Sequence, residues 1–341
     1  MTVLLMGLFL LMAYNSKIYF KGQNKDYISK DGTAAVKGCF LILVFVCHLT
    51  QYITAWNNWD FVFLRFTKGL GQLVVAMFLF YSGYGVTLSA KNKGIDYVKR
   101  IPKHRFLSVL IQFDIAVLLF LITKLILGWK FSLKTTLLSL IGWSSLGNSN
   151  WYIFAILVLY LISFLSFFIF RKSPVCSAAL STVLIAALVL GLKQCKEYWW
   201  YDTLICYAMG IWFAVLKDPI EKLLSKKYVT ESLLLLFAAA FFISYRYIHV
   251  RFLCYEISAV LFTVMILLFT RKVSVQNRVI KYLGDHLFSL YILQRLPMIF
   301  LFRTPLLQHK VLFSLVCAAI TLILGYVFDK LTPKLIKALK L

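Results

Sequence analysis

Apolar segments long enough to enter a membrane recur along almost the whole chain, and no other feature restricts the fold as strongly. Hydrophobic residues make up 61% of the 341 residues, whereas soluble domains contain about 45–50%. The sequence therefore predicts an all-α polytopic membrane protein with about 11 transmembrane helices. The predicted segments are residues 1–14, 36–53, 69–90, 106–127, 151–170, 175–192, 203–216, 229–245, 252–269, 287–302 and 311–328.

The basic residues are distributed unevenly between the connections of these segments. Of the 37 lysines and arginines, 25 lie in one set of alternate connections and 10 in the other. Cytoplasmic connections carry the excess of positive charge in membrane proteins, so we expect the N-terminus outside and the C-terminus in the cytoplasm. The same distribution accounts for the net charge of +24 without a nucleic-acid partner, because the cations form no continuous patch.

Residues 1–341 are expected to form a single domain, because no connection is long enough to hold a second one. Residues 1–14 lack a basic start and an Ala-x-Ala cleavage site, so we interpret them as a retained extra helix before a ten-helix core. Residues 329–341 are expected to be a basic cytoplasmic tail. The seven cysteines lack CxxC and CxxH spacing, which argues against a disulfide framework and against a metal site.

The apolar segment around residues 37–48 has a cation at one end and an imidazole at the other. Eleven residues turn a helix through roughly 1100°, so Lys37 and His48 share one face and lie about 16 Å apart along the axis. With Lys37 at the membrane surface, His48 falls near the middle of the hydrocarbon core. A titratable ring there indicates a reaction or transport path, and the alternative is a histidine hydrogen-bonded to a neighbouring helix.

Two further stretches carry chemical content. Residues 80–89 place Gly83 and Gly85 on either side of an aromatic residue among several hydroxyls, which suits either a ligand passage or close helix packing. Residues 91–105 form a predicted cytoplasmic loop with six cations and a proline. Such a loop could clamp the phosphates of a polyanion such as coenzyme A, or anchor the chain to anionic lipid heads.

The order of these elements resembles acyltransferase family 3, the bacterial membrane enzymes that O-acylate cell-surface glycans. The likeness covers residues 34–328, and it includes a Trp-aromatic helix start at residues 150–155 and a Tyr-containing late helix at residues 289–297. The resemblance implies that His48 is the base that takes the proton from the acceptor hydroxyl, or the residue that receives the acyl group. Histidine suits base chemistry because its unperturbed pKa is about 6.5.

The resemblance also implies roles for other positions. Lys37 would join His48 in catalysis. The phosphates of the acyl-CoA donor would be held by Lys99, Arg100, Lys103 and Arg105. The acyl passage or the acceptor site would be lined by Ser82, Tyr84, Trp151 and Tyr291.

Three positions qualify this assignment. The motif of the family opens with arginine where this chain has Lys37, and lysine keeps the charge but loses the bidentate fork. Gln294 stands where many relatives have histidine, so we assign it no proton transfer. Arg295 lies within a predicted span and needs a carboxylate or a carbonyl partner, for which Asp114 and Glu256 are the candidate carboxylates.

The function implied by the resemblance is transfer of an acetyl group from cytoplasmic acetyl-CoA to a hydroxyl of an extracytoplasmic polysaccharide, in the bacterial cytoplasmic membrane. No bound cofactor or metal is expected. Acyl-CoA, the glycan acceptor and membrane lipid are the expected partners, and a homo-oligomer is compatible with the sequence. The alternative is a transporter or flippase of a lipid-linked or acylated glycan, because many helices with buried charges suit that class equally.

Overall fold

The computed structural model describes residues 1–248, 250 and 252–338, and these residues are mainly helical. The α-helices are α1 (Thr2–Ala13), α2 (Lys30–Leu49), α3 (Phe61–Leu70), α4 (Leu73–Ile101), α5 (Ser108–Ile126), α6 (Leu133–Leu140), α7 (Trp151–Ile169), α8 (Pro174–Cys195), α9 (Ile205–Val215), α10 (Lys217–Leu224), α11 (Val229–Tyr245), α12 (Phe252–Lys272), α13 (Arg278–Asp285), α14 (Leu287–Leu293), α15 (Arg295–Leu301) and α16 (Lys310–Ala338). Short 3-10 turns span Asn58–Asp60, Tyr198–Trp200 and Pro305–Gln308, and Pro102–Leu107 form a π-helical turn. Two strands, β1 (Ser16–Ile18) and β2 (Val273–Val275), pair antiparallel with Ser16 opposite Val275.

All eleven predicted apolar segments are helical, although residues 287–302 are divided into α14 and α15. Among the described residues, six helical runs are long and apolar enough to cross a membrane, or seven if a pair bent by 82° counts as one span. One of these runs, Asn58–Ile126, contains two of the predicted segments. The protein is thus an all-α multi-pass membrane protein, whereas the count of eleven spans and the orientation stay predictions.

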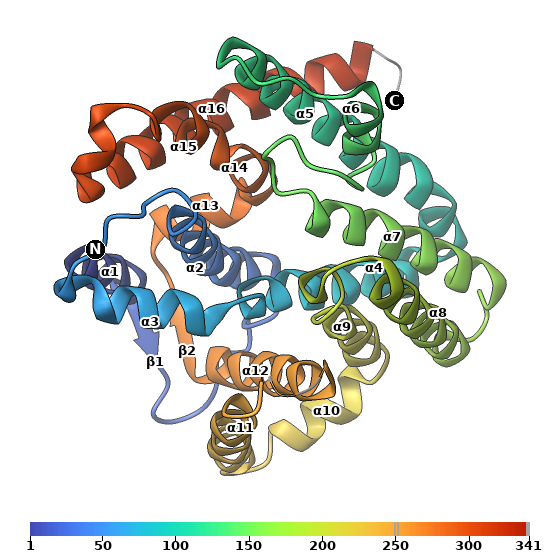
Figure 1. Ribbon diagram of the computed structural model, residues 1–341. Helices are drawn as coiled ribbons and strands as arrows, with labels where there is room; N and C mark the ends of the chain where they lie inside the picture. Colours follow the sequence, from blue (N-terminus) through green and yellow to red (C-terminus); the bar gives the residue numbers. More distant parts are fainter. Residues whose placement is uncertain (249, 251, 339–341) are drawn as a thin grey trace.

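Helix α2 lies inside the bundle, between α4, α13 and α14 (Figure 1). It begins after Ser29, whose side chain accepts a hydrogen bond from the backbone of Gly32 and caps the first turn. Gly38 of α2 and Gly284 of α13 lie where the two backbones cross, because a Cβ atom on Gly38 would overlap the carbonyl oxygen of Ile280. This crossing fixes the depth of α2 against α13.

A second close crossing joins α4 to α9. A Cβ atom on Gly83 would overlap the carbonyl oxygen of Tyr207, and one on Gly210 would overlap that of Phe80. The packing interpretation of residues 80–89 is therefore confirmed for Gly83. It is wrong for Gly85, because a Cβ atom there would meet open space.

One sequence prediction about the basic segments is wrong. Residues 91–105 are not an irregular loop, because the chain is helical on both sides of a kink at Gly94 and the π-helical turn follows directly after Ile101. Lysine and arginine favour helix, Gly94 absorbs a kink with a φ of 65°, and Pro102 is tolerated at the first position of the next turn. Residues 329–338 continue α16 as far as Ala338, and residues 339–341 lie outside the described part. The cytoplasmic position of this basic tail stays a prediction.

Candidate active site

His48 lies in the last turn of α2, which ends at Leu49 rather than at residue 53 as predicted. The Nε2 atom of its partly buried ring is 3.5 Å from Ser149 Oγ. The ring of Tyr291, from α14, lies 6.5 Å away between centroids. The Nδ1 atom of His48 is buried and has no hydrogen-bond partner within the described chain. One ring nitrogen therefore faces a hydroxyl, and the other is unused.

Arg295 supplies a positive charge beside His48. Its guanidinium lies within electrostatic range of the imidazole. Arg295 Nε donates to the hydroxyl of Tyr52 at 3.1 Å, and its Nη1 atom donates to the carbonyl of Asn148 at 3.5 Å. The predicted need for a carbonyl partner is met by Asn148.

The two carboxylates proposed as partners of Arg295 do not take this role. In the described residues neither Asp114 nor Glu256 forms an ion pair with Arg295, and each has one buried carboxylate oxygen without a hydrogen-bond partner. The physical reason is that the connection between α6 and α7 packs against Arg295 and supplies the carbonyl of Asn148 as its partner. The order of residues in the sequence does not reveal this contact.

The connection from α6 to α7 is held by its own hydrogen bonds. Asn148 Oδ1 accepts from the backbone of Leu146 at 3.0 Å, and Ser145 Oγ donates to the carbonyl of Asn148 at 2.8 Å. Gly147 adopts a φ of 103°, which side chains rarely allow. The turn therefore presents Ser149 and the Asn148 carbonyl to His48 and Arg295 in a fixed arrangement.

Aromatic side chains form the wall next to His48. Tyr291 contacts Tyr152 with 5.3 Å between ring centroids, and Tyr152 contacts Phe78 of α4 at 6.2 Å. Ser149 also lies within hydrogen-bonding range of the Tyr291 hydroxyl. Of the residues predicted to line the passage, Tyr291 is therefore beside His48, while Trp151 is one ring further out against Tyr152.

Hydroxyl groups continue from this wall toward the basic end of α4. Ser82 Oγ and the Tyr160 hydroxyl are 3.1 Å apart, and Ser163 Oγ and the Tyr207 hydroxyl are 2.8 Å apart. Tyr160 and Tyr207 both lie within electrostatic range of Tyr152. They lie within the same range of Arg105. Ser82 thus belongs to a polar series between the two ends of the bundle.

Tyr84, which was predicted to line the same passage, packs elsewhere. Its ring stacks on Phe80 and contacts Phe213 of α9 at 5.8 Å. Within the described chain, its ring contacts neither the hydroxyl series nor His48. Residues 82 and 84 are about 200° apart around a helix, so their side chains point to nearly opposite sides of α4.

The basic end has a cavity of about 270 Å³. It is lined by Lys93, Asp96, Tyr97, Arg100, Ile101, His104 and Arg105. Lys99 and Lys103 are exposed on the same turns but do not line it. Lys37, partly buried on α2, lies within electrostatic range of Asp285 and Arg105. The structure therefore brings Lys37 close to the cavity of Arg100 and Arg105, whereas His48 lies eleven residues further along α2.

Sequence reasoning missed Ser149, Asn148, Tyr160 and Tyr207, and it included Tyr152 only as part of the Trp-aromatic motif, without a role. The only signal for the first two was their place directly before the Trp-aromatic start of α7. The tyrosines are spread over two helices and acquire a common environment only through packing.

The fold is that of a multi-pass membrane protein, and its helix α2 carries a partly buried histidine and a lysine within the bundle. A family model described as an acyltransferase domain matches residues 34–330. The chain belongs to acyltransferase family 3, as its sequence resemblance indicated. The comparisons with curated proteins and with solved structures give no match. Helix α1 lies outside the matched region.

Proposed function

We propose that this membrane acyltransferase moves an acetyl group from cytoplasmic acyl-CoA to a hydroxyl of an extracytoplasmic polysaccharide or related glycan, in the bacterial cytoplasmic membrane. One observation carries the proposal. The imidazole of His48 and the cations around Arg105 lie at the two ends of the 37–48 stretch of α2, and hydroxyl-bearing side chains occupy the interior between them. A donor and an acceptor could meet along this series without either crossing the membrane completely.

The donor would bind at the basic end. Arginine guanidinium groups pair with phosphates through two parallel hydrogen bonds, and Arg100 and Arg105 both line the cavity there. Lys99, Lys103 and Lys37 would add positive charge around it. The cavity does not include His48, so the acyl-bearing arm of the donor would have to thread past Ser82 and the tyrosines.

His48 would act at the other end. As a base, it would take the proton of the acceptor hydroxyl while the hydroxyl oxygen bonds to the thioester carbonyl carbon. The carbon–sulfur bond then breaks, and the coenzyme leaves as a thiol after receiving a proton. As an acyl carrier, the imidazole would itself bond to that carbon before the acceptor attacks. In either case Arg295 and Ser149 could stabilise the negative oxygen of the intermediate.

The test follows thiol release from acetyl-CoA by the purified protein, with and without candidate glycans. We expect glycan-dependent release that the His48→Ala variant loses. Transfer by that variant at the parental rate would contradict the proposal.

The bend of 82° between α9 and α10 is the observation that favours a transporter, because broken helices build transporter sites. A transporter would move a glycan across liposomes without consuming thioester. Measuring both quantities in one liposome preparation separates the two functions.

A further inference from the structure

A second basic region lies where three connections of the chain meet. They are the segment after β1, the turn from α10 to α11, and the end of α12. The backbone of Asn24 donates to the carbonyl of Arg271 at 2.7 Å, which ties the first of these segments to α12. The region encloses a cavity of about 1090 Å³. All three connections belong to the lysine-rich set that the sequence predicts to be cytoplasmic.

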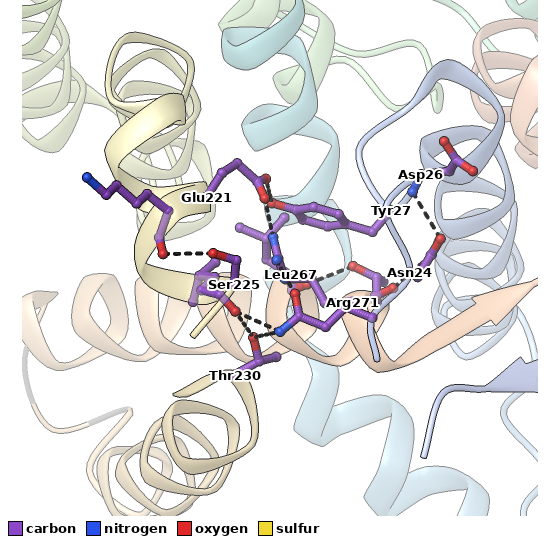
Figure 2. A network of polar contacts seen from close by, with 12 residues as sticks. Asn24, Asp26, Tyr27, Glu221, Ser225, Thr230, Leu267 and Arg271 are labelled. Carbon is purple, nitrogen blue, oxygen red and sulfur yellow. Dashed lines mark hydrogen bonds and ion pairs between the residues drawn. The ribbon is translucent and has the colours of Figure 1, made fainter. Parts of the chain in front are cut away.

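The wall of this cavity is a buried polar network (Figure 2). Arg271, only 4% exposed, donates from Nη1 to Glu221 Oε2 at 2.6 Å and from Nη2 to Gln23. The hydroxyl of Tyr27 donates to the other oxygen of Glu221 at 2.5 Å. Burial raises the pKa of the Tyr27 hydroxyl, so it stays a donor. The amide of Gln23 in turn donates to the carbonyl of Leu224 at 2.6 Å. Contacts within the protein therefore hold the polar side chains of this wall in place.

The charges of the cavity are not balanced by the protein. Its lining residues carry six cations and two carboxylates, and the cations are Lys21, Lys25, Lys222, Lys226, Lys227 and Arg271. Glu221 is engaged by Arg271, and Glu231 is engaged by Lys272 at 2.7 Å. None of the five lysines forms an ion pair with a carboxylate within the described chain. Arg271 Nε is also buried without a hydrogen-bond partner there.

We propose that this cavity binds a phosphate-bearing anion, either an anionic phospholipid headgroup or a soluble phosphorylated molecule. Lysine ammonium groups bind phosphate as point charges, and a buried arginine adds directed donors. Two aromatic side chains also line the cavity and are mostly exposed, Phe20 at 86% and Tyr228 at 65%. Exposed aromatic residues are typical of the membrane interface, where lipid phosphates lie. The site shares no lining residue with the cavity at Arg100 and Arg105.

The test uses the full-length protein in neutral detergent at about 0.15 M salt, where loosely held surface charges are screened. The midpoint of thermal unfolding is measured while inorganic pyrophosphate is added, and separately while phosphatidylglycerol is added. Zwitterionic phosphatidylcholine is the lipid control. We expect a saturable rise of the midpoint with at least one of the two anions. A response to phosphatidylglycerol alone assigns a headgroup, and a response to pyrophosphate assigns a soluble ligand.

Two double variants locate the effect. Lys222→Glu with Lys226→Glu should weaken the apparent binding at least about tenfold, because two charged hydrogen bonds to the phosphate are lost and two negative charges are added. Both lysines are exposed, so folding should tolerate the change. Lys330→Glu with Lys334→Glu alters the net charge equally on exposed positions of α16 and should bind like the parent.

A milder variant, Lys226→Gln with Lys227→Gln, should give a smaller loss than the charge reversal. This variant keeps the test decisive if the reversal lowers the yield of folded protein. The proposal is overturned if neither anion gives a saturable rise, or if the α16 variant loses binding as much as the cavity variant.

Discussion

The two ends of the 37–48 stretch of α2 satisfy their polar groups in different ways. At the end that holds His48, the partners are neutral groups, namely the hydroxyl of Ser149 and, for Arg295, the hydroxyl of Tyr52 and a carbonyl. At the end that holds Lys37, the neighbours are charged, with Asp285 and Arg105 both in electrostatic range. The first arrangement suits the positioning of a proton acceptor, and the second suits the binding of an anion.

The two ends are also held in place differently. Near Lys37, α2 and α13 touch backbone to backbone at Gly38 and Gly284, so that region cannot shift without a clash. Near His48, a connection held by its own hydrogen bonds presents Ser149. The difference teaches that the position of Lys37 depends on helix packing, whereas the position of Ser149 beside His48 depends on one turn of chain before α7.

The largest effect should follow from removing the imidazole. We expect His48→Ala to lower kcat about 10²- to 10⁴-fold, the usual contribution of general acid–base catalysis, with the KM for acetyl-CoA nearly unchanged. His309→Ala, an exposed histidine before α16, is the control. A large change in the KM for acetyl-CoA in His48→Ala would show that His48 also contributes to donor binding, and would contradict the separate roles of the two ends.

The next largest effect should follow from overpacking the crossing of α2 and α13 near Lys37. Gly38→Ala places a methyl group against the carbonyl oxygen of Ile280, and overpacking costs about 1–3 kcal/mol. We expect a lower midpoint of thermal unfolding in detergent. The matched control is Gly85→Ala on α4, where the added methyl meets open space. Equal midpoints for the two variants would show that the crossing does not hold α2.

Binding at the donor end should depend on the two arginines of the small cavity. Arg100→Ala combined with Arg105→Ala should raise the KM for acetyl-CoA about 10- to 100-fold, because each arginine gives charged hydrogen bonds of about 1.5–3 kcal/mol. The value of kcat should change much less. Steady-state kinetics with varied acetyl-CoA measure this, and Lys330→Ala on α16 is the control. A loss confined to kcat would place these arginines in the chemistry instead.

The smallest effect should come from replacing Lys37 by arginine, the residue that opens this motif in the family. Lys37→Arg keeps the charge and adds a fork, so we expect the activity to change less than about fivefold, the size of a weak ion pair. Lys37→Ala should lower it further by removing the charge near Arg105. Comparing initial rates of the two variants checks this. Identical rates would mean that the charge of Lys37 has no role.

The helices and the general position of the site followed from local sequence patterns. All eleven apolar segments are helical, and Lys37 and His48 both lie on α2, with His48 in its last turn and Lys37 about two turns after its start. Local patterns failed at residues 91–105, where the many cations predict a loop but the chain is helical on both sides of Gly94, because lysine and arginine also favour helix. They also failed for the partner of Arg295, which comes from a connection almost 150 residues earlier in the chain.

The sequence by itself determined the membrane class, the helical segments, and the spacing of a cation and a histidine along one helix, because these depend on composition and on the period of 3.6 residues. Only the tertiary structure decided that Ser149 and Arg295 meet at His48, that Ser82 faces the tyrosines while Tyr84 does not, and that five lysines from distant connections surround one cavity. Such contacts depend on how the helices cross. Glycines such as Gly38 and Gly83 allow a close crossing, but their positions in the sequence do not reveal which helix crosses there.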